Sequence, residues 1–460
     1  MVDLVPPARA ATSIVADSPI VQGNQMVFAR LNFTKVVVIV ALLSLLASPV
    51  VAQNWPQWRG AKLDNISEST DLPVEFNREK NLLWKAKLPG PAGASPVVWE
   101  NQVFVTTPNT ETNKLELHCF DATTGDSIWK KILKGENDKV RDGASSASPS
   151  PSTDGNHVWA NTGAGFIECF TMDGEPVWSV DLQKKYGRYN IMFGMTSTPI
   201  VDNGNLYLQL IHGNMRKGTS RGHVVSLDGA TGEELWHHIR ETDGVRENVH
   251  SYASPLIVRE GDIEYLVSHG ADYVIGHSLD DGSELWRCGG LNPQGPAYVN
   301  TLRFVASPTF ASGMLVVPTA KKNGVIALKP DLTGDVTDDK DVKFWTLPKG
   351  TPDVACPLIH DGYVYLADVS GILNIHNAET GKKCFRDRMF ADRHRSTPVY
   401  ADGRIYIAGR KGTVVVLEPG ESGKVLAEND LGEEITASPA IAGSRIYVRT
   451  WDTLYCFSKE

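Results

Sequence analysis

The sequence lacks the short motifs that usually mark an active site. It contains no Gly-rich phosphate loop, no G-x-S-x-G nucleophile motif and no catalytic cysteine context. It has neither a CxxC nor a CxxCH motif, so neither a zinc knuckle nor a covalently attached haem is indicated. Its 45 basic residues form no long run and are outnumbered by 54 acidic ones, which argues against a nucleic-acid partner. No catalytic residue and no metal ligand is therefore predicted from motifs.

Cysteine is scarce, with six residues in a chain of 460. Six cysteines allow 15 disulfide pairings, and the sequence alone does not choose among them. Three of them occupy one register of the repeat described below, where other copies carry Ser or Ala: Cys119, Cys169 and Cys456. That position requires a small side chain, so buried free thiols are expected there.

A targeting segment precedes the predicted domain. The apolar run from Val36 to Ala47 is too short to span a bilayer comfortably, and it follows Arg30 and Lys35. Small residues ending at Ala52 come next, so the pattern is that of a secretory signal peptide. We predict a signal peptide over residues 1–52; an uncleaved anchor is the alternative.

The leader is unusually long, and its first part does not resemble the basic start of a signal peptide. Asp3 and Asp17 lie before Met26, so Met26 is the expected true start. No cysteine lies at the predicted cleavage site, which directly precedes Gln53, so no lipid anchor is expected. The mature chain is expected to be exported to the periplasm or the extracellular space, with no transmembrane span after signal cleavage.

What the sequence does contain is a repeat of four short strands, clearest from Ala253 to Trp286. The runs are rich in Val, Ile, Leu and Tyr and are bounded by Gly, Asp or Pro, as in antiparallel strands joined by tight turns. Each copy opens on a similar dipeptide: Ser95-Pro96, Ser148-Pro149, Thr198-Pro199, Ser254-Pro255, Ser307-Pro308, Cys356-Pro357, Thr397-Pro398 and Ser438-Pro439. A period of this length with four strands predicts a β-propeller.

Aromatic residues recur at two places in the repeat. The second strand carries one at Phe104, Trp159, Tyr207, Tyr265, Tyr365, Tyr406 and Tyr447. The fourth strand carries Gly-x-x-x-Trp at Gly125/Trp129, Gly174/Trp178, Gly232/Trp236 and Gly282/Trp286, with Gly381/Phe385 as a variant. The glycine suits a turn with positive φ, and the indole is expected to fill the gap between neighbouring blades.

The two ends of the chain predict how the ring closes. From Ser438 the chain has room for three strands only, whereas the stretch around Trp84 looks like a lone fourth strand. Pairing the two would complete the last blade and hide a free edge. We therefore predict eight blades in a propeller domain over residues 82–460, with a lead-in over 53–81; seven blades is the alternative.

Long insertions should gather on one face of this ring. They are Lys130–Ser146, Asp181–Thr196, His237–Tyr252, Arg287–Val305 and Ile211–Gly222. Residues just before the first strands should rim the central channel on that face, and five are candidates for binding: His250, Tyr252, Arg303, Asp353 and Arg395. Such a rim could grip a polar ligand or a peptide end, and a merely solvated rim is the alternative.

Two further groups are expected to bind no metal. The acidic stretch Asp331 to Asp341 lacks the Gly and the closing Glu of a helix-loop-helix calcium site, so a solvated turn is expected. His237 and His238 lack further ligands at metal spacing and are expected at the surface.

Taken together, the repeats resemble the pyrroloquinoline quinone (PQQ) repeat family. The motif that carries the resemblance is [ST]P, then G-x-[IL]-Y, then a strand ending in Asp, then TG-x-x-x-W, as in Asp121–Trp129 and Asp228–Trp236. The resemblance covers Leu82 to Glu460. The lead-in NWPQWRG and the ending ENDLGEEITASPA look like the PQQ-binding-like exported propellers of planctomycetes.

Two subfamilies with known roles are distantly similar. Quinoprotein dehydrogenases bind PQQ and calcium on the propeller axis, but their adjacent cysteine pair is missing here and no aspartate matches their base. The outer-membrane barrel assembly lipoprotein is an eight-bladed adaptor, but its lipid-acceptor cysteine is missing. The sequence therefore favours a non-catalytic scaffold with no cofactor, which binds a protein, peptide or glycan through the loop-rich face. The alternative is a PQQ- and calcium-dependent quinoprotein oxidoreductase with a divergent site.

Overall fold

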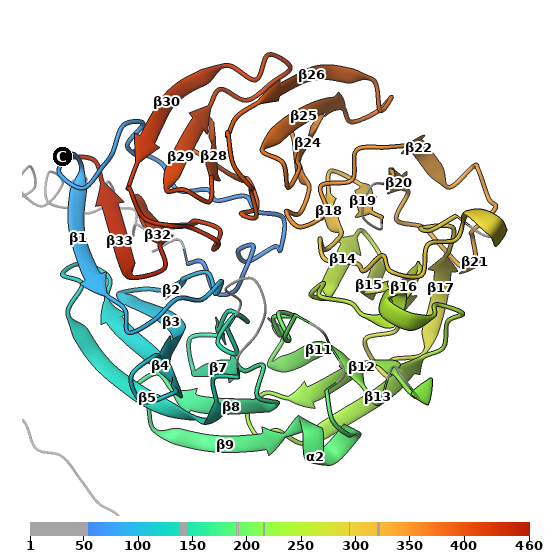
Figure 1. Ribbon diagram of the computed structural model, residues 1–460, viewed down its shortest axis with the longest axis horizontal. Helices are drawn as coiled ribbons and strands as arrows, with labels where there is room; N and C mark the ends of the chain where they lie inside the picture. Colours follow the sequence, from blue (N-terminus) through green and yellow to red (C-terminus); the bar gives the residue numbers. More distant parts are fainter. Residues whose placement is uncertain are drawn as a thin grey trace, which may run out of the picture. The chain divides into compact units, whose positions relative to one another are not determined.

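The computed structural model describes residues 54–138, 145–189, 191, 193–214, 217–293, 295–319 and 323–460. The predicted signal peptide and its cleavage site lie outside these ranges. Within them the chain forms eight antiparallel sheets arranged as blades around a ring (Figure 1). The prediction of an eight-bladed all-β propeller is confirmed, and the seven-bladed alternative is wrong. Among the described residues, no helix is long and apolar enough to cross a bilayer.

The blades follow one another along the chain, each with its first strand nearest the axis (Figure 1). Blade 1 consists of β2 (Val97–Trp99), β3 (Gln102–Asn109), β4 (Lys114–Asp121) and β5 (Ser127–Glu136). Blade 2 consists of β6 (Ser152–Thr153), β7 (His157–Asn161), β8 (Phe166–Thr171) and β9 (Pro176–Asp181). Blade 3 consists of β10 (Ile200–Asp202), β11 (Asn205–His212), β12 (Arg221–Asp228) and β13 (Glu234–Arg240). Blade 4 consists of β14 (Leu256–Glu260), β15 (Ile263–Gly270), β16 (Tyr273–His277) and β17 (Glu284–Cys288).

The second half of the ring repeats the same order. Blade 5 consists of β18 (Thr309–Ala311), β19 (Met314–Pro318), β20 (Val325–Leu328) and β22 (Lys343–Leu347). Blade 6 consists of β23 (Leu358–His360), β24 (Tyr363–Ala367), β25 (Ile372–Asn377) and β26 (Lys383–Arg388). Blade 7 consists of β27 (Val399–Ala401), β28 (Arg404–Ala408), β29 (Thr413–Leu417) and β30 (Val425–Asp430). Blade 8 consists of β31 (Ala440–Ala442), β32 (Arg445–Arg449), β33 (Thr453–Ser458) and β1 (Leu82–Lys87).

Within the described ranges, four short elements lie outside these ladders: α2 (Leu182–Tyr186), η3 (Arg246–Val249), η4 (Gly295–Ala297) and β21 (Gly334–Asp335). The last belongs to the acidic stretch of blade 5, and it pairs in parallel with β17 of blade 4, with Trp286 opposite Gly334. Asp335 is exposed, as expected for a solvated turn, but its backbone also links two blades, which the sequence did not predict.

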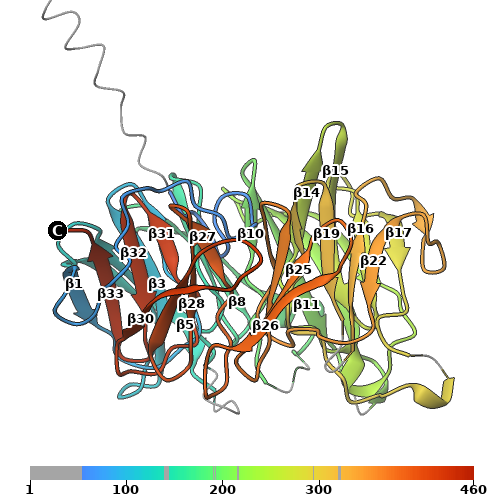
Figure 2. The ribbon, with the colours of Figure 1, turned by 90° about the horizontal axis from the view of Figure 1, so that it is seen from above.

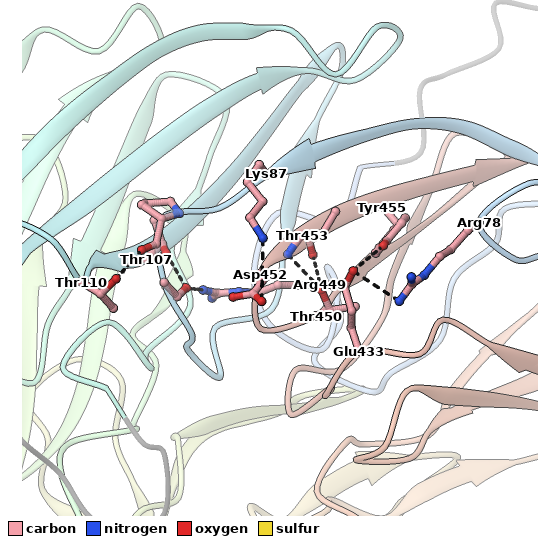
Figure 3. A network of polar contacts seen from close by, with 12 residues as sticks. Arg78, Lys87, Thr107, Thr110, Glu433, Arg449, Thr450, Asp452, Thr453 and Tyr455 are labelled. Carbon is pink, nitrogen blue, oxygen red and sulfur yellow. Dashed lines mark hydrogen bonds and ion pairs between the residues drawn. The ribbon is translucent and has the colours of Figure 1, made fainter.

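The last blade closes through the N-terminal strand, as predicted. β1 pairs with β33, with Trp84 opposite Cys456. A polar network reinforces this seam (Figure 3). The Glu433 carboxylate accepts hydrogen bonds from Thr450 Oγ1 (2.5 Å) and Tyr455 Oη (2.8 Å) and lies 3.5 Å from Arg78 of the lead-in. The closure therefore joins the two ends of the chain by both a strand ladder and charge-assisted hydrogen bonds.

The fourth-strand indoles fill the gaps between blades, as predicted. Where a blade carries the motif glycine, that glycine covers the indole of the blade before it: a Cβ at Gly282 would lie 2.4 Å from the Trp236 ring, and one at Gly232 2.7 Å from that of Trp178. Gly282 also has φ +74°, which favours glycine. The Trp236 indole N–H donates to Leu279 O at 2.8 Å, so packing and a hydrogen bond join the two blades.

Strand patterns follow from this packing. β29 reads TVVVL and is buried from Val414 to Leu417, because neighbouring blades cover both of its faces. The outermost strand β1 buries only Trp84. Two outer strands run beyond their tryptophan, β5 to Glu136 and β13 to Arg240, so the insertions after them are shorter than predicted.

Figure 2 views the ring from its side. Hairpins between first and second strands, such as β14–β15, project from one face. The connections between blades and the hairpins between second and third strands belong to the opposite face, because strand direction alternates within each sheet. We call this opposite face the connection face.

The lead-in crosses the ring near its axis. Trp55 pairs with Val98 of blade 1, and the carbonyl of Pro56 accepts a hydrogen bond from Thr153 of blade 2. Further along, the Asn65 carbonyl accepts from Tyr400 of blade 7, and the Ser67 hydroxyl donates to Ile441 O of blade 8. This segment of about a dozen residues therefore contacts the inner strands of blades 1, 2, 7 and 8, which are consecutive in the closed ring.

A ring of hydroxyl groups joins the starts of the inner strands. The backbone N–H of the residue before the proline in one blade donates to the Ser or Thr hydroxyl of the next blade, at 2.8 to 3.1 Å. Seven such bonds occur: Ser438→Ser95, Ser95→Ser150, Ser150→Thr198, Thr198→Ser254, Ser254→Ser307, Cys356→Thr397 and Thr397→Ser438. We call this set the hydroxyl ring. It explains why the opening dipeptide recurs.

One dipeptide assignment is wrong. In blade 2 the hydroxyl ring includes Ser150, not the predicted Ser148. The first strand starts at Ser152, two residues beyond Ser150, as Val97 starts two residues beyond Ser95. The stretch SPSP offers two equivalent dipeptides, and only the pairing of Ser152 with Trp159 selects the second.

Candidate functional site

A cavity of about 210 Å³ lies on the ring axis, and we call it the axial cavity. Its wall is formed by the starts of the inner strands, including six members of the hydroxyl ring: Ser95, Ser150, Thr198, Ser254, Thr397 and Ser438. Because each of these hydroxyls accepts a backbone hydrogen bond from the neighbouring blade, their positions are fixed by the fold. The part of the wall that the hydroxyl ring forms is therefore polar, uncharged and rigid.

Trp58 of the lead-in also lines the axial cavity. The guanidinium carbon of Arg59 lies 4.9 Å from the centre of the Trp58 ring, within the range of a cation–π contact. Arg59 is itself buried and donates to the carbonyls of Pro308 (2.6 Å) and Pro255 (3.3 Å). Burial lowers the pKa of Arg59 from its ordinary value. The lead-in thus supplies an aromatic surface anchored to blades 4 and 5.

Trp58 was not among the residues predicted to bind. The available signal was the motif NWPQWRG, which places two tryptophans and an arginine in a segment without strand periodicity. Such side chains are costly to leave in water, so a strandless segment that contains them must pack against something.

The two arginines predicted for the rim, Arg303 and Arg395, are half-buried and line the cavity as well. The Arg303 guanidinium lies 4.5 Å from the centre of the Phe193 ring and 3.5 Å from the Glu247 carboxylate. Phe193 also lines the cavity, and its backbone N–H donates to Tyr252 Oη at 3.2 Å. Four connections between blades, those after β9, β13, β17 and β26, therefore converge here.

The five predicted rim residues do not all reach the cavity. Tyr252, Arg303 and Arg395 line it, whereas His250 and Asp353 are buried beside it. Burial, helped by the Arg303 charge, lowers the pKa of His250 to about 4, so its ring is neutral at pH 7. Asp353 has φ +70°, and its carbonyl accepts a hydrogen bond from Ala306. Asp353 thus holds the connection that carries Arg303.

The chemistry of the axial cavity is that of a binding site for an anion. Its described lining contains two arginines, aromatic rings and hydroxyl groups, and it contains no carboxylate, imidazole or thiol. No group of three or more His, Cys, Asp or Glu residues in the described part of the chain could hold a metal ion. Guanidinium groups beside aromatic and hydroxyl groups suit a carboxylate or a phosphate.

Other predicted features lie away from this cavity. All six cysteines are free thiols; Cys384 is exposed and the others are buried, including the three in the shared register. His237, expected at the surface, is half-buried, and its Nε2 lies 2.8 Å from Nδ1 of His223 on the neighbouring strand.

Comparisons with known proteins agree with this geometry. The family model PQQ_2, described as outer membrane protein assembly factor BamB, matches residues 74–207, 113–385 and 369–458. No curated protein sequence matches the chain. Among solved structures, BamB from Moraxella catarrhalis is similar with a TM-score of 0.59 and 12% identity, covering 82% of this chain and 99% of that one.

Two quinoprotein structures are also similar. A quinohemoprotein alcohol dehydrogenase from Comamonas testosteroni has a TM-score of 0.63 and 14% identity, covering 89% of this chain and 81% of that one. A europium-containing methanol dehydrogenase has a TM-score of 0.67 and 11% identity, covering 88% of this chain and 98% of that one. At these identities the likeness shows the fold, which binding proteins and dehydrogenases share.

Proposed function

Because the chain belongs to the PQQ_2 family, described as outer membrane protein assembly factor BamB, and shares its fold with quinoprotein structures as well, we propose its function from the cavity itself. We propose that it is an exported, non-catalytic scaffold that binds a protein or peptide partner on the connection face. An anionic group of the partner, a terminal or side-chain carboxylate, enters the axial cavity between Arg303 and Arg395.

One observation carries this proposal: two arginines and an aromatic surface line the axial cavity, and no described lining residue has a carboxylate. A carboxylate placed there would meet donors on a preorganised wall, so little conformational entropy would be lost on binding. The family match supports a protein partner, since the model's description names an assembly factor.

The alternative of a PQQ- and calcium-dependent oxidoreductase fits less well. Trp58 offers a flat surface on which a planar quinone could stack. Calcium, however, takes six to eight oxygen ligands, usually including carboxylates, and the described lining offers hydroxyl and carbonyl oxygens only. The residues present therefore do not fit the calcium ion, and no reaction step is assigned to them.

Fluorescence polarisation tests the proposal. The probes are a labelled pool of short peptides with free C-terminal carboxylates and the same pool with C-terminal amides. We expect binding of the carboxylate pool that weakens about 10- to 100-fold on Arg303→Ala or Arg395→Ala, as for loss of a charge-assisted hydrogen bond.

Arg410→Ala is the matched control. Arg410 lies in the β28–β29 hairpin, contacts Trp451 and Glu434, and is outside the axial cavity. It should bind the peptides like the wild type. Equal binding of the amide pool, or full binding by both cavity variants, would contradict the proposal.

A further inference from the structure

A second cavity, of about 740 Å³, lies where blade 3 connects to blade 4. β12 and β13, the connection after Arg240, and Ala271 of blade 4 bound it. Its volume falls in the range of small-molecule sites. It shares no described lining residue with the axial cavity.

Arg240 is the most unusual side chain in this lining. It is only 2% exposed, yet all three of its guanidinium nitrogens lack a hydrogen-bond partner among the described residues. Burial alone lowers its pKa to about 10, because no carboxylate offsets the lost hydration. An unpaired buried charge costs far more than a buried ion pair with good geometry, so a partner is expected.

Two other buried arginines show how this fold normally satisfies such a group. Arg449 donates to the carbonyls of Ala94 (3.1 Å) and Thr106 (2.9 Å), and Figure 3 shows its guanidinium held within the seam of blades 8 and 1. Arg59 likewise donates to two carbonyls. Arg240 has no such carbonyls, although it is buried to the same degree.

The Arg240 guanidinium packs closely against the backbone of the neighbouring strands β12 and β15. A Cβ at Gly222 would lie 2.5 Å from its Nη2, and one at Gly270 would lie 3.3 Å from its Nη1. Both positions are glycine, so no side chain separates the guanidinium from the strands beside it.

The rest of the lining is basic as well. Arg221 and Arg246 are exposed at the edge of the cavity, and Glu241 is the single carboxylate in its described lining. Thr242 adds a hydroxyl group. Three arginines against one glutamate make the local field positive, in a chain whose formal net charge is −9.

We propose that this cavity is a second ligand site, in which Arg240 binds the oxyanion of a small phosphorylated, sulfated or carboxylated molecule while Arg221 and Arg246 face its outer part. A guanidinium presents paired N–H groups that match such oxyanions. The site is independent of the axial cavity and of the function proposed for it.

Calorimetric titration of the purified protein with inorganic phosphate, sulfate and citrate, each in turn, tests this site. We expect saturable binding of at least one; phosphate or sulfate would indicate a tetrahedral ligand group, and citrate a carboxylate. Arg240→Met should weaken that binding about 10- to 100-fold, as for loss of a charge-assisted bidentate contact. No binding of any of the three, or unchanged affinity in a folded Arg240→Met protein, would overturn the proposal.

Two further variants separate binding from folding. Arg246 lies at the exposed edge, so the Arg246→Gln protein should keep the melting temperature of the wild type and bind the anion a few-fold more weakly. If the Arg240→Met protein does not fold, Arg246→Gln serves as the test in its place. Arg449→Met should lower the melting temperature yet keep the wild-type affinity, because its guanidinium is satisfied by carbonyls elsewhere. If the Arg240→Met protein does not fold and Arg246→Gln leaves the affinity unchanged, the proposed site is refuted.

Discussion

The backbone N–H of Ser438 in blade 8 donates a 3.0 Å hydrogen bond to the hydroxyl of Ser95 in blade 1. The two residues are the last and first of their kind in the chain, and their contact closes the hydroxyl ring at the blade seam. Both residues also line the axial cavity. The motif that repeats along the sequence is thus both the joint between blades and the wall of the candidate site.

Ser95→Ala should destabilise the protein. It leaves the buried N–H of Ser438 without its acceptor, which costs about 1–3 kcal/mol. The free energy of unfolding in urea measures the loss, with Ser127→Ala, at an exposed position on β5, as the control. Equal stability of the two variants would show that the hydroxyl ring contributes nothing.

Cys356→Ser should instead raise the free energy of unfolding. Cys356 is the one member of the ring without a hydroxyl, and among the described residues no acceptor takes the N–H of Ser307 in the preceding blade. A serine would supply that acceptor in a similar volume, and a net gain of about 0.5–1.5 kcal/mol is expected. A lower melting temperature than that of the wild type would count against this account of the ring.

Trp236→Ala should cost about 3–5 kcal/mol, because the indole is buried between blades 3 and 4. Gly282→Ala tests the same contact from the other side, since its Cβ would lie 2.4 Å from the indole at φ +74°. If Gly282→Ala acts through this clash, it should destabilise wild type more than it destabilises Trp236→Ala, which a double-mutant cycle measures. Strict additivity would refute the Gly–Trp contact.

Stability should fall in mild acid because several histidines are buried without charge. Burial lowers the pKa of His394 from 6.5 to about 4. Between these values the unfolded chain binds a proton that the native state does not, so the free energy of unfolding decreases as pH falls from about 6.5 to about 4. His394→Gln should flatten this slope by up to about 1.4 kcal/mol per pH unit. Urea unfolding at pH 7.5, 6 and 5 measures it, and an unchanged slope would contradict the assignment.

The fold was predictable because each blade carries its own local signals. The dipeptide, the second-strand aromatic and the Gly-x-x-x-Trp turn are close in sequence, so one period defines one sheet. The closure by Trp84 followed from the three strands left after Ser438. Blade 5 has no glycine four residues before Trp345, so the motif did not predict that this indole lies between blades. In the structure it packs against Gly381 of blade 6, as the other fourth-strand indoles pack against the motif glycine of the next blade.

The candidate site was only partly predictable. Position before a first strand placed Tyr252, Arg303 and Arg395 at the axial cavity, but it did not distinguish them from the buried His250 and Asp353. Trp58 and Arg240 were missed for a common reason. Both act through contacts across the ring or between blades, and such contacts leave no periodic trace in the sequence.

Calorimetric titration of the carboxylate peptide pool in the presence of EDTA tests the central claim most directly. The account predicts saturable, calcium-independent binding to the wild type and its loss in the Arg303→Ala/Arg395→Ala double variant, with the melting temperature of that variant kept. Binding that requires calcium, or that survives in the double variant, would contradict the assignment of the axial cavity as a carboxylate-binding site.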